Sequence, residues 1–400
     1  MTAQSLRADA GELDHRYLSA IFAELCRIES PSGHERRCGQ RVAEELHAIG
    51  LEVEEDDAAA QLGYESGNLL ARISAASGRG GDGVDHAQAR SVLLCAHLDT
   101  VPLQAPVEPE LVEGVWQNAN HGILGADNKA AVAVLLALAR HIRGAGCPLD
   151  VELLFTVGEE VALAGARAFD IARLRSGVGY VFDHASPIGE VIVASPTHLR
   201  IDATFRGRSA HAGIRPERGR SAIVAAARAI ASMSLGRVDD ESTANVGCIS
   251  GGSAMNVVAE QCSLVAEARS LRDERAEQLA GEMVARMQEA ANECGCECDV
   301  DVSVQRTFAG YRLPASRPVV LAAETALRAC GHEPLHVTSG GASDANVFNA
   351  RGMEVVNVAN GTEANHEPGE RVSEQALQQM LEVALSLLDA LAADGGALAR

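Results

Sequence analysis

Three short apolar segments, each ending in or closely followed by acids or an imidazole, constrain the fold more than any other feature of the chain. SVLLCAHLD at 91–99 and VELLFTV at 151–157 are almost uninterrupted apolar runs, and YVFD at 180–183 repeats the pattern. Such runs are typical of strands that are buried on both faces of a parallel sheet. Helical patterns alternate with them. The sequence therefore predicts an α/β domain with a mostly parallel sheet and helices on both faces.

The pattern changes from about His198. A half-exposed strand, a helix, two strands, a helix over 273–292 and a last strand near 297–306 follow in turn. This βαββαβ order is typical of a compact two-layer α+β unit. Because βα alternation resumes after Pro314 and 400 residues exceed what one core usually supports, we predict an inserted ferredoxin-like domain. The predicted boundaries are 1–197 and 309–400 for the two segments of the catalytic domain, and 198–308 for the insertion.

Composition excludes several classes of partner. The net charge of -21 argues against nucleic acid and anionic membranes as binding surfaces. The first twenty residues contain no apolar stretch of the kind found in a secretory signal, and the longest apolar run, at 130–139, is too short to span a bilayer. The ten cysteines are too sparse for a disulfide scaffold. We therefore expect a cytoplasmic protein with reduced thiols.

Five potential metal ligands are spread along the chain. No two of them form a compact ligand motif, so a fold must gather them. Two imidazoles and three carboxylates suit two divalent metals that share one carboxylate better than a single tetrahedral zinc ion. Asp99 and Glu159 lie beside these residues and are available for acid/base work. The five ligands are His97 in CAHLDTV, Asp127 in GADNKAA, Glu160 in TVGEEV, Asp183 in YVFDH and His366 in NHEPGE.

Each of these residues also has an ordinary interpretation. Asp127 stands where a helix begins, and Asp is favoured there as an N-cap. Glu159 and Glu160 point in different directions from adjacent positions, so one can bind metal while the other moves protons, or both can be solvated. His366 lies in a turn closed by Pro368, where a histidine is often only a surface residue.

The motifs together carry a family resemblance over nearly the whole chain. CAHLDTVP, GADNKAA, GEE, GRSAHAG, GGSAMNVV and SDANVFNARG occur in this order between SPSGHE and HEPGERV. The sequence resembles the superfamily of two-zinc amidohydrolases that includes peptidase T, carboxypeptidase G and succinyl-diaminopimelate desuccinylase, and it is most similar to the peptidase T-like members. The resemblance implies a metal-dependent enzyme that cleaves a peptide bond in short peptides, as an aminopeptidase or tripeptidase.

The resemblance also implies a role for each ligand. His97 and Asp183 are expected to hold one metal, and Glu160 and His366 the other, with Asp127 bridging the two. Two zinc ions per subunit are expected, although cobalt and manganese suit the same nitrogen and oxygen ligands.

Further roles follow from the same resemblance. Glu159 is expected to be the general base, and Asp99 to orient His97. The inserted domain is expected to act as a lid or as the contact of a homodimer, and His211 in GRSAHAG to stabilise the oxyanion, within its own subunit or across an interface.

Two residues of the insertion match substrate-binding positions of the family. Asn256 and Arg269 are expected to contact the substrate, Arg269 near its carboxylate, because a guanidinium binds carboxylate with two hydrogen bonds. The alternative for Arg269 is an ion pair with Asp273 at a strand end. CGCEC, with Cys294, Cys296 and Cys298, lacks the usual CxxC spacing, so small buried apolar residues are the alternative to a metal or redox site.

One departure from the family leaves the substrate open. Peptidase T proper has an arginine at the start of a Gly-rich turn where this chain has Ser339, in VTSGGASDAN. The alternative substrate is therefore an N-acylated amino acid, from which an acyl or carbamoyl group is removed. A non-catalytic binding protein is a third interpretation, but such relatives usually lack ligands and this chain lacks none.

Overall fold

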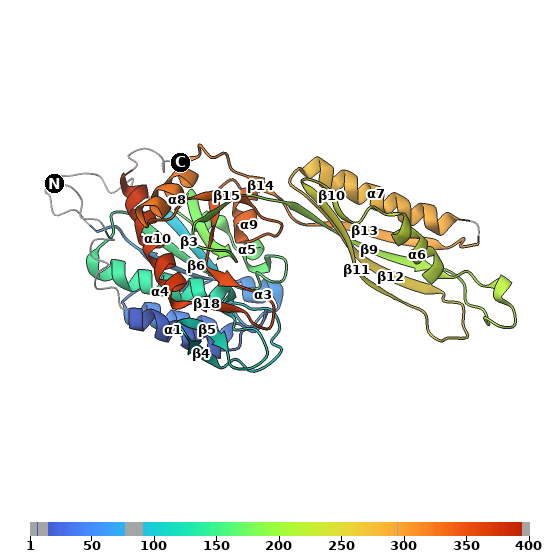
Figure 1. Ribbon diagram of the computed structural model, residues 1–400, viewed down its shortest axis with the longest axis horizontal. Coiled ribbons are helices and arrows are strands. Elements are labelled where there is room, and N and C mark those ends of the chain that lie inside the picture. The colour runs from blue at the N-terminus through green and yellow to red at the C-terminus, as the bar shows by residue number, and fades with distance from the viewer. Residues whose placement is uncertain (1–5, 7–14, 77–90, 294, 394–400) are drawn as a thin grey trace. The chain divides into compact units, whose positions relative to one another are not determined.

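The chain folds into two compact units (Figure 1). The computed structural model describes residue 6 and residues 15–76, 91–293 and 295–393. The first unit comprises Met1–Val193, Leu313–Ser339 and Ser343–Arg400. The second comprises Ala194–Arg312 and Gly340–Ala342, so it is an insertion into the first. The segment 76–89, whose Gly-rich composition predicts a surface loop, falls almost entirely outside the described residues.

A nine-stranded mixed sheet forms the centre of the first unit. Its strand order is β1-β2-β6-β3-β7-β16-β8-β14, with β15 paired to β8. The four central strands, β6, β3, β7 and β16, are parallel to one another, as predicted from their apolar runs. Their carboxyl ends therefore meet at one edge of the sheet. The strands are β1 Val53–Glu55, β2 Leu69–Ile73, β3 Ser91–His97, β6 Asp150–Thr156, β7 Val178–His184, β8 Glu190–Ser195, β14 Tyr311–Arg312, β15 Leu335–Thr338 and β16 Glu354–Ala359.

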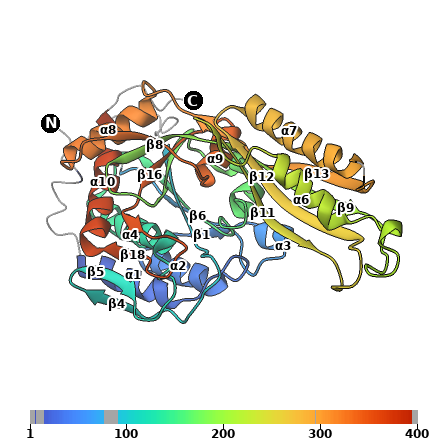
Figure 2. The same cartoon turned by 45° about the vertical axis from the view of Figure 1, so that its right-hand side comes forward.

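Helices cover both faces of this sheet (Figure 2). The Tyr180 hydroxyl donates to Val319 of α8, whereas the Cys95 thiol, on the opposite face, approaches Asp344 of α9. Helix α10 packs against α8 and α4, and α5 packs against α9. The predicted three-layer arrangement is confirmed. The helices are α1 His15–Arg27, α2 Arg36–Ala48, α3 Ala58–Leu62, α4 Ala126–Ala145, α5 Ala164–Ala168, α8 Pro318–Ala329, α9 Asp344–Ala350 and α10 Glu374–Ala393.

Two helices illustrate how apolar this core is. Helix α4 is buried almost all round, including Lys129, the only lysine of the sequence, whose Nζ donates to the Ile28 carbonyl. A buried ammonium needs such a partner because leaving water costs it its hydration. Helix α10 is long and apolar enough to cross a membrane by length and composition, but most of it is buried inside the unit, which is typical of a core helix.

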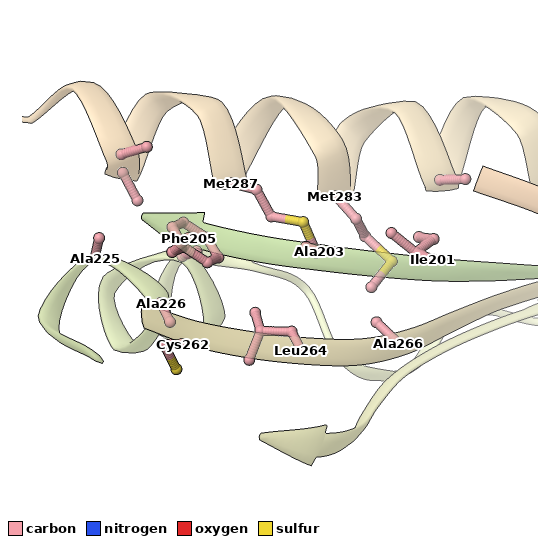
Figure 3. Close-up of a cluster of buried hydrophobic side chains, with 14 of the residues drawn as sticks. Ile201, Ala203, Phe205, Ala225, Ala226, Cys262, Leu264, Ala266, Met283 and Met287 are labelled. Carbon is pink, nitrogen blue, oxygen red and sulfur yellow. The ribbon is translucent and has the colours of Figure 1, made fainter. Parts of the chain in front are cut away.

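The second unit is a five-stranded antiparallel sheet with two helices on one face. Its order is β10-β11-β12-β9-β13, which is the predicted βαββαβ unit with one added edge strand, β10. Alternate residues of β9, such as Ile201 and Phe205, pack against Met283 and Met287 of α7 (Figure 3). The elements are β9 Thr197–Arg206, α6 Ala222–Ser232, β10 Gly236–Asp239, β11 Ser242–Gly251, β12 Gln261–Ser270, α7 Asp273–Asn292 and β13 Asp299–Phe308.

A small four-stranded sheet of order β17-β18-β5-β4 lies in the first unit and was not predicted. Its strands are short and mostly exposed, so they lack the apolar runs that reveal the central strands. They are β4 Pro109–Val112, β5 Val115–Asn118, β17 Thr362–Glu363 and β18 Arg371–Ser373.

Two local predictions were wrong. The sequence pattern over 162–174 predicts one helix, but the structure has only α5 and a 3₁₀ turn at Ile171–Arg173, because Ala162 and Leu163 adopt positive φ in a turn. The spacing of Ser32 and Glu35 predicts a capping box at the start of a helix, but the box does not form, and α2 begins at Arg36. The Ser32 hydroxyl donates to Asp99, and the Glu35 carboxylate accepts from Gly33 and Gly158 instead.

Candidate metal centre

The carboxyl edge of the parallel strands gathers the five predicted ligands. His97 ends β3, and Asp183 is the penultimate residue of β7. Glu160 lies in the turn after β6, Asp127 in the first turn of α4, and His366 in the loop between β17 and β18. Strands that run in parallel deliver their polar ends to the same edge, which is why residues far apart in sequence meet here.

The ligands form two pockets with Asp127 in common. In the first, the Nε2 atom of His97 lies 3.2 Å from Oδ1 of Asp127 and 3.6 Å from Oδ1 of Asp183. In the second, the Nε2 atom of His366 lies 3.2 Å from Oδ2 of Asp127 and 2.8 Å from Oε1 of Glu160. The possible ligand atoms within each trio all lie within 4.8 Å of one another. Asp127 therefore turns one oxygen to each pocket, and it does not cap its helix.

The donor atoms fit divalent cations. Oε1 of Glu160 is buried and accepts no hydrogen bond, although Nε2 of His366 lies 2.8 Å from it. Two polar atoms that approach without hydrogen-bond geometry are suitably placed to share a cation. The nitrogen and oxygen donors also match the preferences of zinc and similar metals.

The electrostatics of the cluster favour positive charge. Burial disfavours a charged His97, but Asp183 and Asp127 raise the pKa of His97 well above its usual value. Contacts with Asp127 and Glu160 raise the pKa of His366 to about 10. Burial raises the pKa of Asp183 to about 7. A cation that enters must displace the protons held by His97, His366 and Asp183, since metal binding and proton release are linked.

Glu159 stands beside the pockets as a separate carboxylate. It is nearly buried, and its carboxylate has no hydrogen-bond partner among the described residues. Burial, followed by the negative charge of Asp183, raises the pKa of Glu159 well above its usual value. It also lies within 4.8 Å of donor atoms of His97 and Glu160. The position of Glu159 suits proton transfer. Because its carboxylate lies this close to His97 and Glu160, Glu159 is also an alternative metal ligand.

Asp99 contacts more than the residue predicted for it. Its Oδ1 lies 3.3 Å from Nδ1 of His97, in line with an orienting role. Both carboxylate oxygens also accept backbone hydrogen bonds, Oδ1 from Glu159 at 2.9 Å and Oδ2 from Glu160 at 3.1 Å. Asp99 thus contacts the imidazole ring of His97 and the backbone amides of Glu159 and Glu160.

Sequence reasoning missed the residues that hold the ligands in place. Asn365 donates to Oδ2 of Asp127, and Asn128 donates to Oδ1 of Asp183. Glu370 is buried and accepts the backbone amides of Leu124, Gly125 and Asp127. Such outer hydrogen bonds orient ligands and tune their basicity. Asn128, Asn365 and Glu370 lie inside or next to GADNKAA and NHEPGE, and that adjacency was the only signal available.

The predicted residues of the insertion lie in the second unit. His211 and Asn256 occupy neighbouring loops, since His211 bridges to Val257 and Ala212 donates to the Asn256 carbonyl. His211 is exposed.

Arg269 has different partners from those expected. Its guanidinium makes two hydrogen bonds to Glu267 and one to the Gly340 carbonyl. The alternative of an ion pair with Asp273 was wrong, because Asp273 pairs with Arg306. Glu267 lies two residues away on the same strand face, which places the two side chains side by side.

The cysteine motif is only partly described, because Cys294 lies outside the described residues. Cys296 and Cys298 are buried and unoxidised, and the Cys298 thiol faces the Cys296 carbonyl. Their burial fits the apolar alternative, although both precede β13 and do not lie within it.

Two cation pockets that share a carboxylate, with a further acid beside them, are typical of hydrolases that activate water between two metals. The sequence profile of Peptidase family M20/M25/M40 matches residues 93–390, and the chain belongs to this family. It is a hydrolytic enzyme of the metal-dependent class.

Relatives over the full length agree with this family. The chain is 33% identical over 378 residues to the uncharacterised protein YqjE of Bacillus subtilis, which covers 94% of this chain and 99% of YqjE. The crystal structure of aminopeptidase PepT from Bacillus cereus is similar with a TM-score of 0.85 at 33% identity, covering 95% of this chain and 99% of that one. A tripeptidase from Staphylococcus aureus is similar with a TM-score of 0.88 at 31% identity, covering 96% and 100%.

Proposed function

We propose that this protein is a two-zinc peptidase that cleaves short peptides at their amino-terminal end. The observation that carries the proposal is the approach of one Asp127 oxygen to His97 and of the other to His366, which suits two cations bridged by one carboxylate. The similarity to an aminopeptidase and a tripeptidase over nearly the whole chain supports short peptides as the substrate class.

The ligand assignment in this proposal follows the two pockets. His97 and Asp183 would hold one zinc ion, Glu160 and His366 would hold the other, and Asp127 would contribute one oxygen to each. When bound, two such ions would lower the pKa of a water molecule toward neutrality and polarise the scissile carbonyl.

The remaining chemistry belongs to the side chains. Glu159 accepts the proton of the attacking water and returns it to the leaving amine, a role that its raised pKa suits. Asp99 keeps His97 in the tautomer that leaves Nε2 free for metal, because Nδ1 faces the Asp99 carbonyl and carboxylate.

The second unit provides substrate contacts in this proposal. His211 stabilises the oxyanion, and Asn256 and Arg269 bind the substrate, Arg269 at its carboxylate. Arg269 already pairs with Glu267, whose pKa is lowered to about 2 by His198 and then by Arg269. A substrate carboxylate must therefore compete with Glu267 or share the guanidinium with it.

Ser339 favours a second candidate function. Without an arginine at this position, the substrate is an N-acylated amino acid, from which an acyl or carbamoyl group is removed. The same pockets and the same base serve this reaction, since both reactions cleave an amide bond.

A substrate panel on zinc-loaded protein separates the two candidates. Di- and tripeptides with free amino termini are compared with N-acetyl, N-succinyl and N-carbamoyl amino acids, and metal content is measured on the same preparation. We expect kcat/KM to be highest for a free-amino peptide. Activity confined to acylated amino acids would reject the peptidase, and a protein that retains no divalent metal after dialysis would reject both.

We also propose a homodimer formed through the second unit. From Asn245 onward, β11 pairs only with β12 among the described strands, so its other edge is free for pairing. Strand β11 carries the half-exposed Ile249, and the exposed Ile223 of α6 lies beside Gly252, which directly follows β11. The residues from Asn245 to Gly251 include no charged side chain, whereas β13, at the opposite edge of the sheet, carries several. Charged side chains usually protect an edge strand from pairing with another chain, so this part of β11 lacks that protection.

Introducing a charge on the β11 edge should therefore break the dimer. We expect Ile249→Glu to shift the mass measured by light scattering from twice the chain mass of 41.8 kDa to that of a single chain. Val304→Glu, at a similarly exposed position on β13, is the matched control and should leave the mass unchanged. A wild-type protein that is already monomeric at micromolar concentration contradicts the proposal.

We further propose a cytoplasmic location. The nine described cysteines are all free thiols, which suits a reducing compartment. Detection of the protein in a secreted fraction would count against it.

A further inference from the structure

Glu35 is a buried carboxylate outside the predicted site. It stands at the N-terminal end of α2, but its side chain does not cap that helix. Oε1 accepts the backbone amides of Gly33 at 2.8 Å and Gly158 at 3.0 Å. Oε2 is buried and accepts nothing. The whole side chain is shielded from solvent, so these two hydrogen bonds are its described contacts with polar groups.

The backbone amide of Gly158 is the first of three consecutive amides that donate hydrogen bonds to carboxylates. Glu35 accepts from Gly158, and Asp99 accepts from Glu159 and from Glu160. These are the first residues of the turn by which the chain leaves β6 and presents the two acids to the pockets. Because adjacent peptide planes share an α-carbon, fixing the Gly158 amide restricts the directions in which Glu159 and Glu160 can point.

Packing gives the same point of the turn little freedom. Gly158 has a φ of 59°, which favours glycine. A Cβ atom added there would lie 2.6 Å from Cε2 of Tyr64, whose ring also covers Gly33. Glu35 therefore joins the two glycines beneath one aromatic ring, and neither backbone segment has room to move toward it.

We propose that Glu35 is a positioning residue for the acidic turn: one acceptor oxygen, Oε1, fixes Gly158 and thereby aims Glu159 and Glu160. The proposal rests on the proposed function only for the roles of those two acids. The feature of Glu35 that the structure uses is an acceptor oxygen, because both amides share Oε1 while Oε2 has no partner. Burial raises the pKa of Glu35 to about 7.

Because only Oε1 of Glu35 accepts hydrogen bonds, two variants can separate the loss of the acceptor from the loss of the carboxyl group. Glu35→Gln keeps the acceptor oxygen and places the amide nitrogen at the position of Oε2, which has no hydrogen-bond partner. Glu35→Ala removes the acceptor. The matched control is Glu152→Ala. Glu152 is equally buried and accepts the Arg175 and Ser176 amides, but it lies near the other end of β6.

The experiment uses zinc-loaded full-length protein at a temperature well below the melting point of every variant. We expect Glu35→Ala to lower kcat by about 10- to 100-fold, the usual range for outer hydrogen-bond partners, with little change in KM. Glu35→Gln should recover most of that loss, and Glu152→Ala should lower the melting temperature without lowering kcat. Full activity in Glu35→Ala, or equal loss in Glu35→Gln, overturns the proposal.

A second readout does not depend on substrate. Hydrogen exchange of the peptide covering 157–165 should accelerate in Glu35→Ala and not in Glu35→Gln or Glu152→Ala. Unchanged exchange in Glu35→Ala overturns the proposal. Accelerated exchange in a protein whose wild type cleaves no amide substrate supports the positioning role and rejects the proposed function. If Glu35→Ala does not fold, Glu35→Asp replaces it, because the shorter side chain cannot reach both amides.

Discussion

Replacing Glu159 with glutamine should lower kcat by about two to four orders of magnitude, the usual contribution of general acid–base catalysis, while two metal ions stay bound. Glutamine keeps the size of the side chain but cannot accept the proton of the attacking water. The other five acids and imidazoles of the pockets remain in place, so the metal content measured by atomic emission should not change.

Glu160→Gln is the matched comparison for this variant. Glu160 lies next to Glu159 in the chain, but its Oε1 atom lies 2.8 Å from His366, inside the second pocket. We expect Glu160→Gln to lose both activity and one metal ion. If Glu159→Gln loses metal to the same extent, Glu159 is a ligand, as its distance from His97 and Glu160 also permits, and the base must be another group.

Replacing Asp127 with asparagine should disrupt both pockets at once. Only Asp127 among the five ligands turns an oxygen to each imidazole, at 3.2 Å in both cases. An amide nitrogen in place of either oxygen cannot bridge two cations. We expect zinc affinity to fall by more than the 10- to 100-fold typical of outer hydrogen-bond partners, the bound metal to fall from two ions to one or none, and activity to disappear.

Calorimetric zinc titration of the metal-free protein checks this expectation. Asp57→Asn, at an exposed position in the same unit, is the control and should bind two ions. Two ions bound to Asp127→Asn with unchanged affinity would contradict a shared carboxylate and leave two independent sites.

The regular parts of this fold were readable because their signals are local. The helix over 273–292 has the predicted bounds, since acids at its start and an amphipathic pattern define it within the segment itself. The central strands were readable because burial on both faces makes them apolar throughout. His97 and Asp183 could be placed at one edge for the same reason.

Features that depend on tertiary partners could not be read in this way. Ser32 and Glu35 have the spacing of a capping box. Instead, the Ser32 hydroxyl donates to Asp99, and the Glu35 carboxylate accepts from the amide of Gly158, and both partners lie far along the chain. Glu370 looks like a loop acid, and its hydrogen bonds to the backbone beside Asp127 depend on two loops more than two hundred residues apart. The resemblance of the motifs to a known family therefore indicated which residues meet, but not what holds them in position.

The burial of Lys129 has a practical consequence for labelling. The sequence contains no other lysine. The side chain of Lys129, which belongs to α4, is buried, and its Nζ atom donates a hydrogen bond to the Ile28 carbonyl. Amine-directed dyes and crosslinkers therefore find no reactive side chain on the folded enzyme, apart from the chain terminus. A single lysine introduced on the surface of either unit would consequently be a unique attachment point.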